Sequence, residues 1–172
     1  MKNIYIILSH SGTIMSRIVR LYTRYKYSHV SISLDKNMTK MYSFGRKKVY
    51  NPFNGGFTVE SKDGIFYRTF KNTKCSIIEL SITKEQYNNL KKILDSYNEN
   101  KDVYKYDIIG VILRAVNIKV NRKNYFYCTK FIKEVLEDSD IYHFEEDFVK
   151  PKYFMELPNI KIIYTGKLSS YS

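Results

Sequence analysis

The sequence predicts an α+β protein in which helices pack against an antiparallel sheet. Short runs of alternating apolar and polar residues, typical of strands, are bounded by turn-forming residues. Longer segments with apolar residues every three or four positions, typical of helices, lie between groups of strands. Because most of the strands follow one another through short turns, we expect hairpins and therefore antiparallel pairing.

Length and composition favour one globular domain. The 172 residues are enough to bury a sizeable core, and 44% of them are hydrophobic. No repeat, linker or low-complexity stretch interrupts the chain, so residues 1–172 are expected to fold together. The segments predicted as strands are 3–8, 29–34, 40–44, 57–60, 65–70, 75–82 and 160–164. The segments predicted as helices are 13–24, 83–97, 104–116 and 128–136.

The first quarter of the chain predicts a strand, a helix and a hairpin. An isoleucine-rich run at 3–8 is followed by a Ser-Gly-Thr break and by helical spacing over 13–24, with three arginines on the wet side. From His29, polar and apolar residues alternate as far as position 34. The turn-forming Asp-Lys-Asn at 35–37 returns the chain, which places residues 43–46 beside His29.

The middle of the chain predicts a loop, short strands and a capped helix. Residues 46–56 contain Asn-Pro and Asn-Gly-Gly, which are breaker sequences, and are expected to form a loop. Short apolar runs at 57–60 and 65–70 read as strands, and Cys75 begins another. Thr83 and Gln86 have the spacing of a capping box, which predicts the helix start.

The last third predicts two helices and a final strand. The segment 104–116 is apolar with helical spacing, and 121–124 is a polar turn. From Cys128, apolar side chains occur at positions 128, 131, 132, 135 and 136, which is the stripe of a helix packed by one face. A proline-led tail ends in the strand at 160–164.

Charge and cysteine content narrow the functional classes. The formal charge of +12 favours anionic partners, but the cations are mostly scattered lysines. Without a clustered basic helix or a recognised motif, nucleic acid is not a favoured partner. Two cysteines make no disulfide framework, and Cys75 reads as a small buried strand residue. Without a signal-peptide pattern or an apolar run long enough to span a membrane, a cytoplasmic location is expected.

Cys128 and His29 are the residues that suggest chemistry. A thiol at the start of a helix is near unpaired N–H groups and the positive end of the helix dipole, which favour a thiolate. A histidine far away in sequence can serve as the base of such a nucleophile. We therefore expect the sulfur of Cys128 to face the imidazole of His29 in one groove. The third, ring-orienting group is expected on the neighbouring strand, where Ser43 is the best choice and Glu60 the next.

Nearby tyrosines are candidates for substrate binding. Tyr27 and Tyr42 are placed to donate to an oxyanion or to line the cleft, and Tyr127 precedes the cysteine. His10 is a competing base, because spacing alone does not separate it from His29. His143 lies beside acidic residues and is expected to be exposed.

Other interpretations remain open from the residues alone. A cysteine on an apolar helix face is most often a packing residue, and a histidine at a strand start is most often a satisfied polar one. No histidine pair or Cys-x-x-Cys has metal-ligand spacing, and no glycine-rich phosphate loop is present, so no metal or cofactor is expected.

The order of motifs resembles the circularly permuted papain-like folds, which include the YiiX-like and NlpC-type cysteine hydrolases and the lecithin:retinol acyltransferase group. The resemblance rests on the segments at 27–32, 41–44 and 126–131 and on the proline-led tail. It implies a nucleophilic role for Cys128 and a base role for His29. Ser43 stands where YiiX-like members tend to place a glutamate, so the sequence departs from the family there.

The resemblance implies a cysteine-dependent hydrolase or acyltransferase that works through a thioester. Its substrate is expected to be a peptide, small-molecule or lipid acyl compound, and the formal charge of +12 favours an anionic one. The alternative is a papain-like scaffold with weak or lost activity that binds an anionic ligand or a partner.

Overall fold

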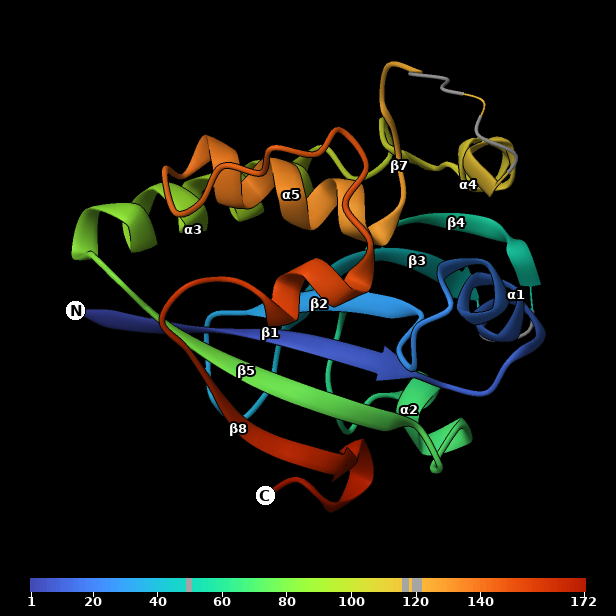
Figure 1. Cartoon of the computed structure of the whole chain (residues 1–172), viewed down its shortest axis with the longest axis horizontal. Coiled ribbons are helices and arrows are strands. Elements are labelled where there is room, and N and C mark those ends of the chain that lie inside the picture. Colours follow the sequence, from blue (N-terminus) through green and yellow to red (C-terminus); the bar gives the residue numbers. More distant parts are fainter. Residues whose placement is uncertain (49–50, 116–117, 119–121) are drawn as a thin grey trace.

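A six-stranded antiparallel sheet forms the centre of the computed structural model, which describes residues 1–48, 51–115, 118 and 122–172 (Figure 1). The strand order is β4-β3-β2-β1-β5-β8, and every neighbouring pair is antiparallel. The predicted α+β class with an antiparallel sheet is therefore confirmed. The strands of this sheet are β1 (Lys2–His10), β2 (His29–Ser33), β3 (Met41–Lys48), β4 (Asn51–Glu60), β5 (Lys74–Ile82) and β8 (Ile160–Lys167).

The helices cover the two faces of the sheet unequally. In Figure 1, α3 and α5 lie together over one face, whereas the short α2 lies at the other. A separate parallel pair is formed by the two-residue strands β6 (Lys105–Tyr106) and β7 (Tyr125–Phe126), and in Figure 1 β7 stands beside α4. The helices in the described ranges are α1 (Ile14–Thr23), α2 (Ile65–Thr69), α3 (Lys84–Glu99), α4 (Ile108–Ala115) and α5 (Cys128–Asp138). The smaller elements are β6 (Lys105–Tyr106), β7 (Tyr125–Phe126) and the 3₁₀ turns η1 (Pro151–Met155) and η2 (Leu168–Ser170).

Strand alternation divides the hydrophobic core into two parts. Ile4, Ile6 and Leu8 of β1 belong to the larger cluster, which also contains the buried faces of α3 and α5. Tyr5 and Ile7 belong to the smaller cluster on the other face, together with residues of α2 and η2. In β1, the even-numbered residues therefore face the larger cluster and the odd-numbered residues face the smaller one.

An aromatic cluster anchors α5 to the sheet. Phe44 of β3 is fully buried, and its ring centroid lies 4.9 Å from that of Phe126 and 5.2 Å from that of Phe131. Phe57 and Tyr97 complete the contacts, from β4 and α3. Because Phe126 precedes α5 and Phe131 lies in its first turn, this packing sets the position of the helix start.

The expected loop at 46–56 is wrong in the described part of that segment. β3 and β4 pair through it, with Gly45 opposite Gly56 and Arg46 opposite Gly55, while residues 49–50 lie outside the described residues. Gly55 is required for packing, because a Cβ at this position would lie 2.6 Å from the Cβ of Tyr106. Here glycine permits close approach of another segment and does not break the strand.

The expected strand at 65–70 is also wrong, because these residues form α2. The N–H of Arg68 bonds to the carbonyl of Gly64, and the hydroxyl of Thr69 bonds to the carbonyl of Ile65. A short apolar run has no clear periodicity, and the tertiary structure decided its conformation.

The predicted helix at 104–116 begins later than expected, at Ile108, and position 116 lies outside the described residues. Asp107 explains the late start. Its carboxylate accepts a hydrogen bond from the N–H of Gly110 at 2.9 Å, as an N-terminal cap does, and its own N–H bonds to the carbonyl of Phe126. Residues 105–106 are therefore held in β6, paired with β7.

Within the described ranges, no helix combines the length and the apolar character needed to cross a bilayer.

Candidate active site

Cys128 is the first residue of α5, and its side chain is 94% buried, with 6% of its surface exposed. Tyr127 occupies the N-cap position without a side-chain cap bond, so the first N–H groups of the helix remain available. The thiol receives hydrogen bonds from the backbone N–H groups of Val30, Thr129 and Cys128 itself. Three donors therefore converge on the sulfur where the helix meets β2.

These donors do not make the thiol acidic. Burial raises the pKa of Cys128 to about 11, and the N–H groups offset only part of that effect. The thiol of Cys128 is therefore neutral at physiological pH in this state. The thiolate expected from the helix position alone is outweighed by desolvation.

His29 begins β2 and projects from the opposite face of the sheet. Val30 and Ile32 belong to the core beneath α5, so alternation turns His29 away from that helix. The ring lies against Gly45 of β3, where an added Cβ would lie 3.6 Å from the His29 Cε1. The predicted placement of His29 beside residues 43–46 is thus confirmed.

The imidazole of His29 is neutral as well. Burial lowers the pKa of His29 to about 4, and the positive charge of Arg46 lowers it further. The side chain is nevertheless only partly buried, because it borders a cavity. Within the described chain, no hydrogen bond joins the ring to Cys128 or to another residue.

Cys128 and His29 line neighbouring cavities. β2 pairs with β3 at Ile32 and Ser33, and next to His29 the N–H of Val30 bonds to the Cys128 sulfur. His29 lines one cavity and Cys128 lines another, and Val19, Ser28 and Tyr106 line both. The expectation that sulfur and imidazole face each other in one groove is therefore wrong: they line two separate cavities that share walls around the start of β2.

Glu60 and Arg46 share the cavity of His29. Burial raises the pKa of Glu60 to about 7, although the charge of Arg46 opposes this effect. The guanidinium of Arg46 donates to the hydroxyl of Thr13 at 3.2 Å and lies over the ring of Phe66, 5.2 Å from its centroid. A carboxyl that titrates near neutrality beside an imidazole suits proton transfer.

Ser43 lies on the same face as His29 but bonds elsewhere. It is 2% exposed, and its hydroxyl forms a hydrogen bond with the hydroxyl of Thr58 at 3.2 Å. Of the two orienting residues expected from the sequence, only Glu60 borders the His29 cavity.

Tyr106 is a site residue that the sequence did not single out. Burial raises its pKa, the thiolate form of Cys128 would raise it further, and the charge of Arg46 lowers it. The pairing of Tyr106 with Phe126 across β6 and β7 brings it to the segment that precedes Cys128. Only this tertiary pairing reveals its role, because the residue lies inside a segment that reads as an apolar helix.

The three expected substrate-binding tyrosines lie in three different places. Tyr127 lines the Cys128 cavity and packs against Phe148, with centroids 5.7 Å apart. Tyr27 lines a separate groove beside α1. Tyr42 lies in the core under α3 and packs against Phe57.

The other histidines lie outside both cavities. The Nδ1 of His10 forms a hydrogen bond with the hydroxyl of Ser28 at 3.1 Å, and Arg20 donates to its Nε2 at 3.3 Å. Burial and the charges of Arg20 and Arg17 lower the pKa of His10. His143 is exposed, as expected, with its Nε2 3.7 Å from a carboxylate oxygen of Asp140. In the described ranges, no group of three or more His, Cys, Asp or Glu side chains is arranged to hold a metal ion.

No protein-family model matches this chain, and no curated protein matches it.

Proposed function

We propose that this chain is a cysteine-dependent acyl hydrolase or acyltransferase of the circularly permuted papain-like type, with Cys128 as nucleophile and His29 as base. One observation carries the proposal. The thiol of Cys128 accepts a hydrogen bond from the N–H of Val30, the residue after His29, where the two cavities adjoin. The helix that begins with Cys128 therefore contacts the strand that begins with His29, which brings the two groups that this chemistry uses onto adjoining elements.

In the proposed first step, His29 acts as a general base. Its neutral ring accepts the proton of Cys128 while the sulfur bonds to the acyl carbonyl carbon and the carbonyl π electrons move onto oxygen. The resulting oxyanion is held by the backbone N–H of Cys128 and by the hydroxyl of Tyr106. The tetrahedral intermediate then collapses, and the imidazolium returns the proton to the departing group.

The second step removes the acyl group. His29 takes a proton from water or from another acceptor, whose oxygen or nitrogen attacks the thioester carbon. The carbon–sulfur bond breaks, the sulfur regains a proton from the imidazolium, and the acyl product leaves. The two neutral resting groups favour this general-base route over a preformed thiolate–imidazolium pair.

The proposal requires the His29 ring to move. The ring rests against Gly45 on the face opposite α5, so it reaches the sulfur only if the backbone at the start of β2 changes as well. Glu60 and Arg46, which share its cavity, are proposed to set the charge around the imidazolium as it forms. A deprotonated Glu60 stabilises the imidazolium, whereas the positive charge of Arg46 destabilises it and favours the return of its proton.

The substrate class follows from the walls of the Cys128 cavity. Val19, Tyr22, Val111 and Phe148 give it an apolar lining, and its volume of about 30 Å³ admits only a small apolar group such as the end of an acyl chain. We therefore favour a lipid or apolar amide acyl group over a highly polar one.

The test is to trap the thioester. Wild-type protein is mixed with short- and long-chain p-nitrophenyl acyl esters, and intact mass spectrometry detects an acyl adduct that neutral hydroxylamine removes. Cys128→Ala should abolish the adduct, and His29→Ala should slow its formation by about 100-fold or more. Cys75→Ala is the matched control, because Cys75 is a fully buried residue of β5 outside both cavities. An adduct that survives Cys128→Ala contradicts the proposal.

A second candidate is a binding module without catalysis. The observation in its favour is that no hydrogen bond joins the Cys128 thiol to the His29 ring in the described chain, and that burial keeps both groups neutral. On this alternative, no ester acylates Cys128, and apolar ligands bind Cys128→Ala as tightly as wild type.

A further inference from the structure

The outer face of α1 is an exposed apolar stripe. Ile14, Ile18 and Leu21 are 80%, 53% and 82% exposed. Their spacing of four and three residues places them within about 60° of one another around the helix. The helical spacing of residues 13–24 alone suggested a buried stripe, but α1 is packed by its other side, where Val19, Tyr22 and Thr23 line the Cys128 cavity. Large apolar side chains gathered on an exposed face mark an interaction surface.

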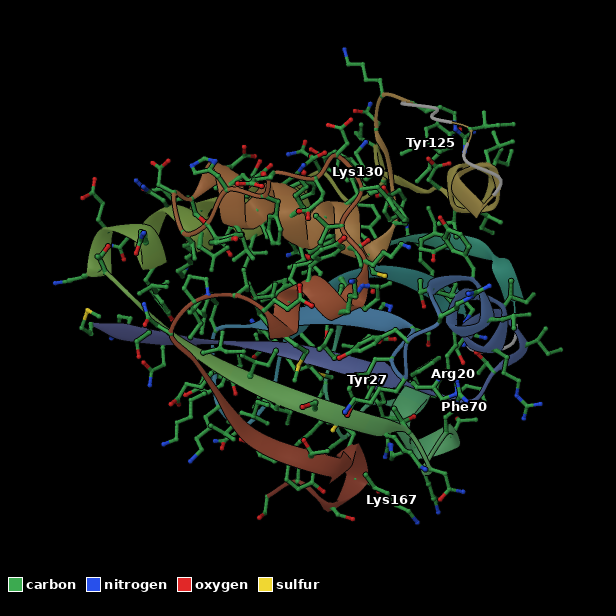
Figure 2. All side chains as sticks on the ribbon, in the orientation of Figure 1. Arg20, Tyr27, Phe70, Tyr125, Lys130 and Lys167 are labelled. Carbon is green, nitrogen blue, oxygen red and sulfur yellow. The ribbon has the colours of Figure 1, made fainter. Side chains whose placement is uncertain are left out.

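Arginines border this stripe along one side. Arg17 and Arg20 lie about 60° and 120° from Ile14 around the helix, on the same flank, and Arg24 follows as the left-handed C-cap residue. Arg17, Arg20 and Arg24 are exposed. The arginine side faces a groove in which Arg20, Tyr27 and Lys167, labelled in Figure 2, take part.

The groove is strongly basic. Among its lining residues in the described chain none is acidic, and six carry a positive charge. The six are Arg17, Arg20, Arg24, Lys26, Lys74 and Lys167. A groove of one sign beside an exposed apolar stripe is complementary to a surface that is both anionic and apolar.

We propose that α1 docks this protein on the surface of an anionic phospholipid bilayer. Ile14, Ile18 and Leu21 enter the boundary between headgroups and acyl chains, while the arginines and the basic groove contact lipid phosphates. A nucleic acid would use the cations alone and would leave the apolar stripe in water, so the bilayer accounts for both features.

The docked orientation deepens the proposed function. The stripe is on the outer side of α1, and the inner side of the same helix forms a wall of the Cys128 cavity. Only α1 would therefore separate a bilayer that contacts the stripe from the Cys128 cavity. This part rests on the proposed acyl chemistry and names the acyl group of a membrane lipid as substrate, whereas docking itself needs no reactive thiol.

Vesicle co-sedimentation of the full chain tests the docking surface. The probes are vesicles of equal parts phosphatidylglycerol and phosphatidylcholine, and vesicles of pure phosphatidylcholine. We expect binding to the anionic vesicles only. Ile18→Ser and Leu21→Ser should each reduce the partition coefficient about tenfold. Arg17→Gln and Arg24→Gln should each reduce it about fivefold.

Matched controls lie elsewhere on the surface. Ile162→Ser removes an isoleucine that is 51% exposed on β8, and Lys84→Gln with Lys92→Gln removes two exposed charges from α3. These variants should bind like wild type, with circular dichroism confirming the fold of every variant. Equal losses in the controls and in the α1 variants would overturn the proposal. The proposal would also be overturned if the protein bound no vesicles and bound duplex DNA strongly, with the same affinity in Leu21→Ser as in wild type.

Cys128→Ala separates docking from chemistry. This variant should bind anionic vesicles like wild type even if no ester ever acylates Cys128. Vesicle binding lost with the thiol would overturn the α1 surface, whereas failed acylation alone removes only the proposed function.

Discussion

Alkylation of Cys128 distinguishes a buried neutral thiol from a preformed ion pair with His29. Burial raises the pKa of the thiol from 9.0 to about 11, so the thiolate fraction at pH 7 falls about 100-fold. A more basic thiolate is also more nucleophilic, by about tenfold over two pKa units, which offsets part of the loss. We therefore expect iodoacetamide to react about ten times more slowly with Cys128 than with a model thiol. As long as the pH is below the pKa, the rate should increase about tenfold for each unit by which the pH is raised.

The assay is peptide mass spectrometry of the alkylated protein in a Cys75→Ala background. That background is needed because Cys75 is the other thiol of the chain, although burial raises its pKa to about 12. His29→Gln should leave the rate unchanged, since no hydrogen bond joins the ring to the sulfur in the described chain. A rate that levels off below pH 7, or that falls in His29→Gln, would refute the burial argument.

The remaining predictions concern packing and titration, and urea denaturation measures both. Gly55→Ala should lower the free energy of unfolding by about 1–3 kcal/mol, because the new Cβ would lie 2.6 Å from the Cβ of Tyr106. Gly45→Ala should lower it far less, because the nearest atom to its new Cβ is the Cε1 of His29, at 3.6 Å. Similar losses in the two glycine variants would contradict this reasoning. Burial raises the pKa of Glu60 from 4.5 to about 7, so the folded protein loses stability as pH rises between these values, and Glu60→Gln should gain about 1–3 kcal/mol at pH 8 and nothing at pH 4. Burial lowers the pKa of His29 from 6.5 to about 4, so wild type loses stability as the pH falls across that interval. His29→Gln should not show this loss. Parallel pH profiles of the unfolding free energy for wild type and His29→Gln would exclude a contribution from His29.

Elements with strong local signals were predictable. The capping box of α3 is present, with the side chains of Thr83 and Gln86 each bonded to the other's backbone N–H. The start of α5 at Cys128 was also predicted, because its apolar stripe runs uninterrupted. The β3–β4 hairpin and α2 were missed, because glycines read as breakers and short apolar runs have no decisive period.

The candidate site was predictable in part. The neighbourhood of His29 and Gly45 followed from the expected hairpin register. The face from which His29 projects depends on which side α5 packs, which alternation alone cannot say. Tyr106 and Arg46 come from segments that the sequence assigned to a helix and a loop, so their approach to the site needed the tertiary structure.

The two-residue pairing of β6 with β7 closes a loop of chain at its base. Tyr106 and Phe126 are tied together at the two ends of a long excursion that includes α4. Shortening, lengthening or replacing that excursion would leave the phenol and the sulfur in register, while changing the hydrocarbon wall that Val111 contributes. Exchanging this insert would therefore reshape the cavity around Cys128 and leave the β6–β7 pairing beside it intact.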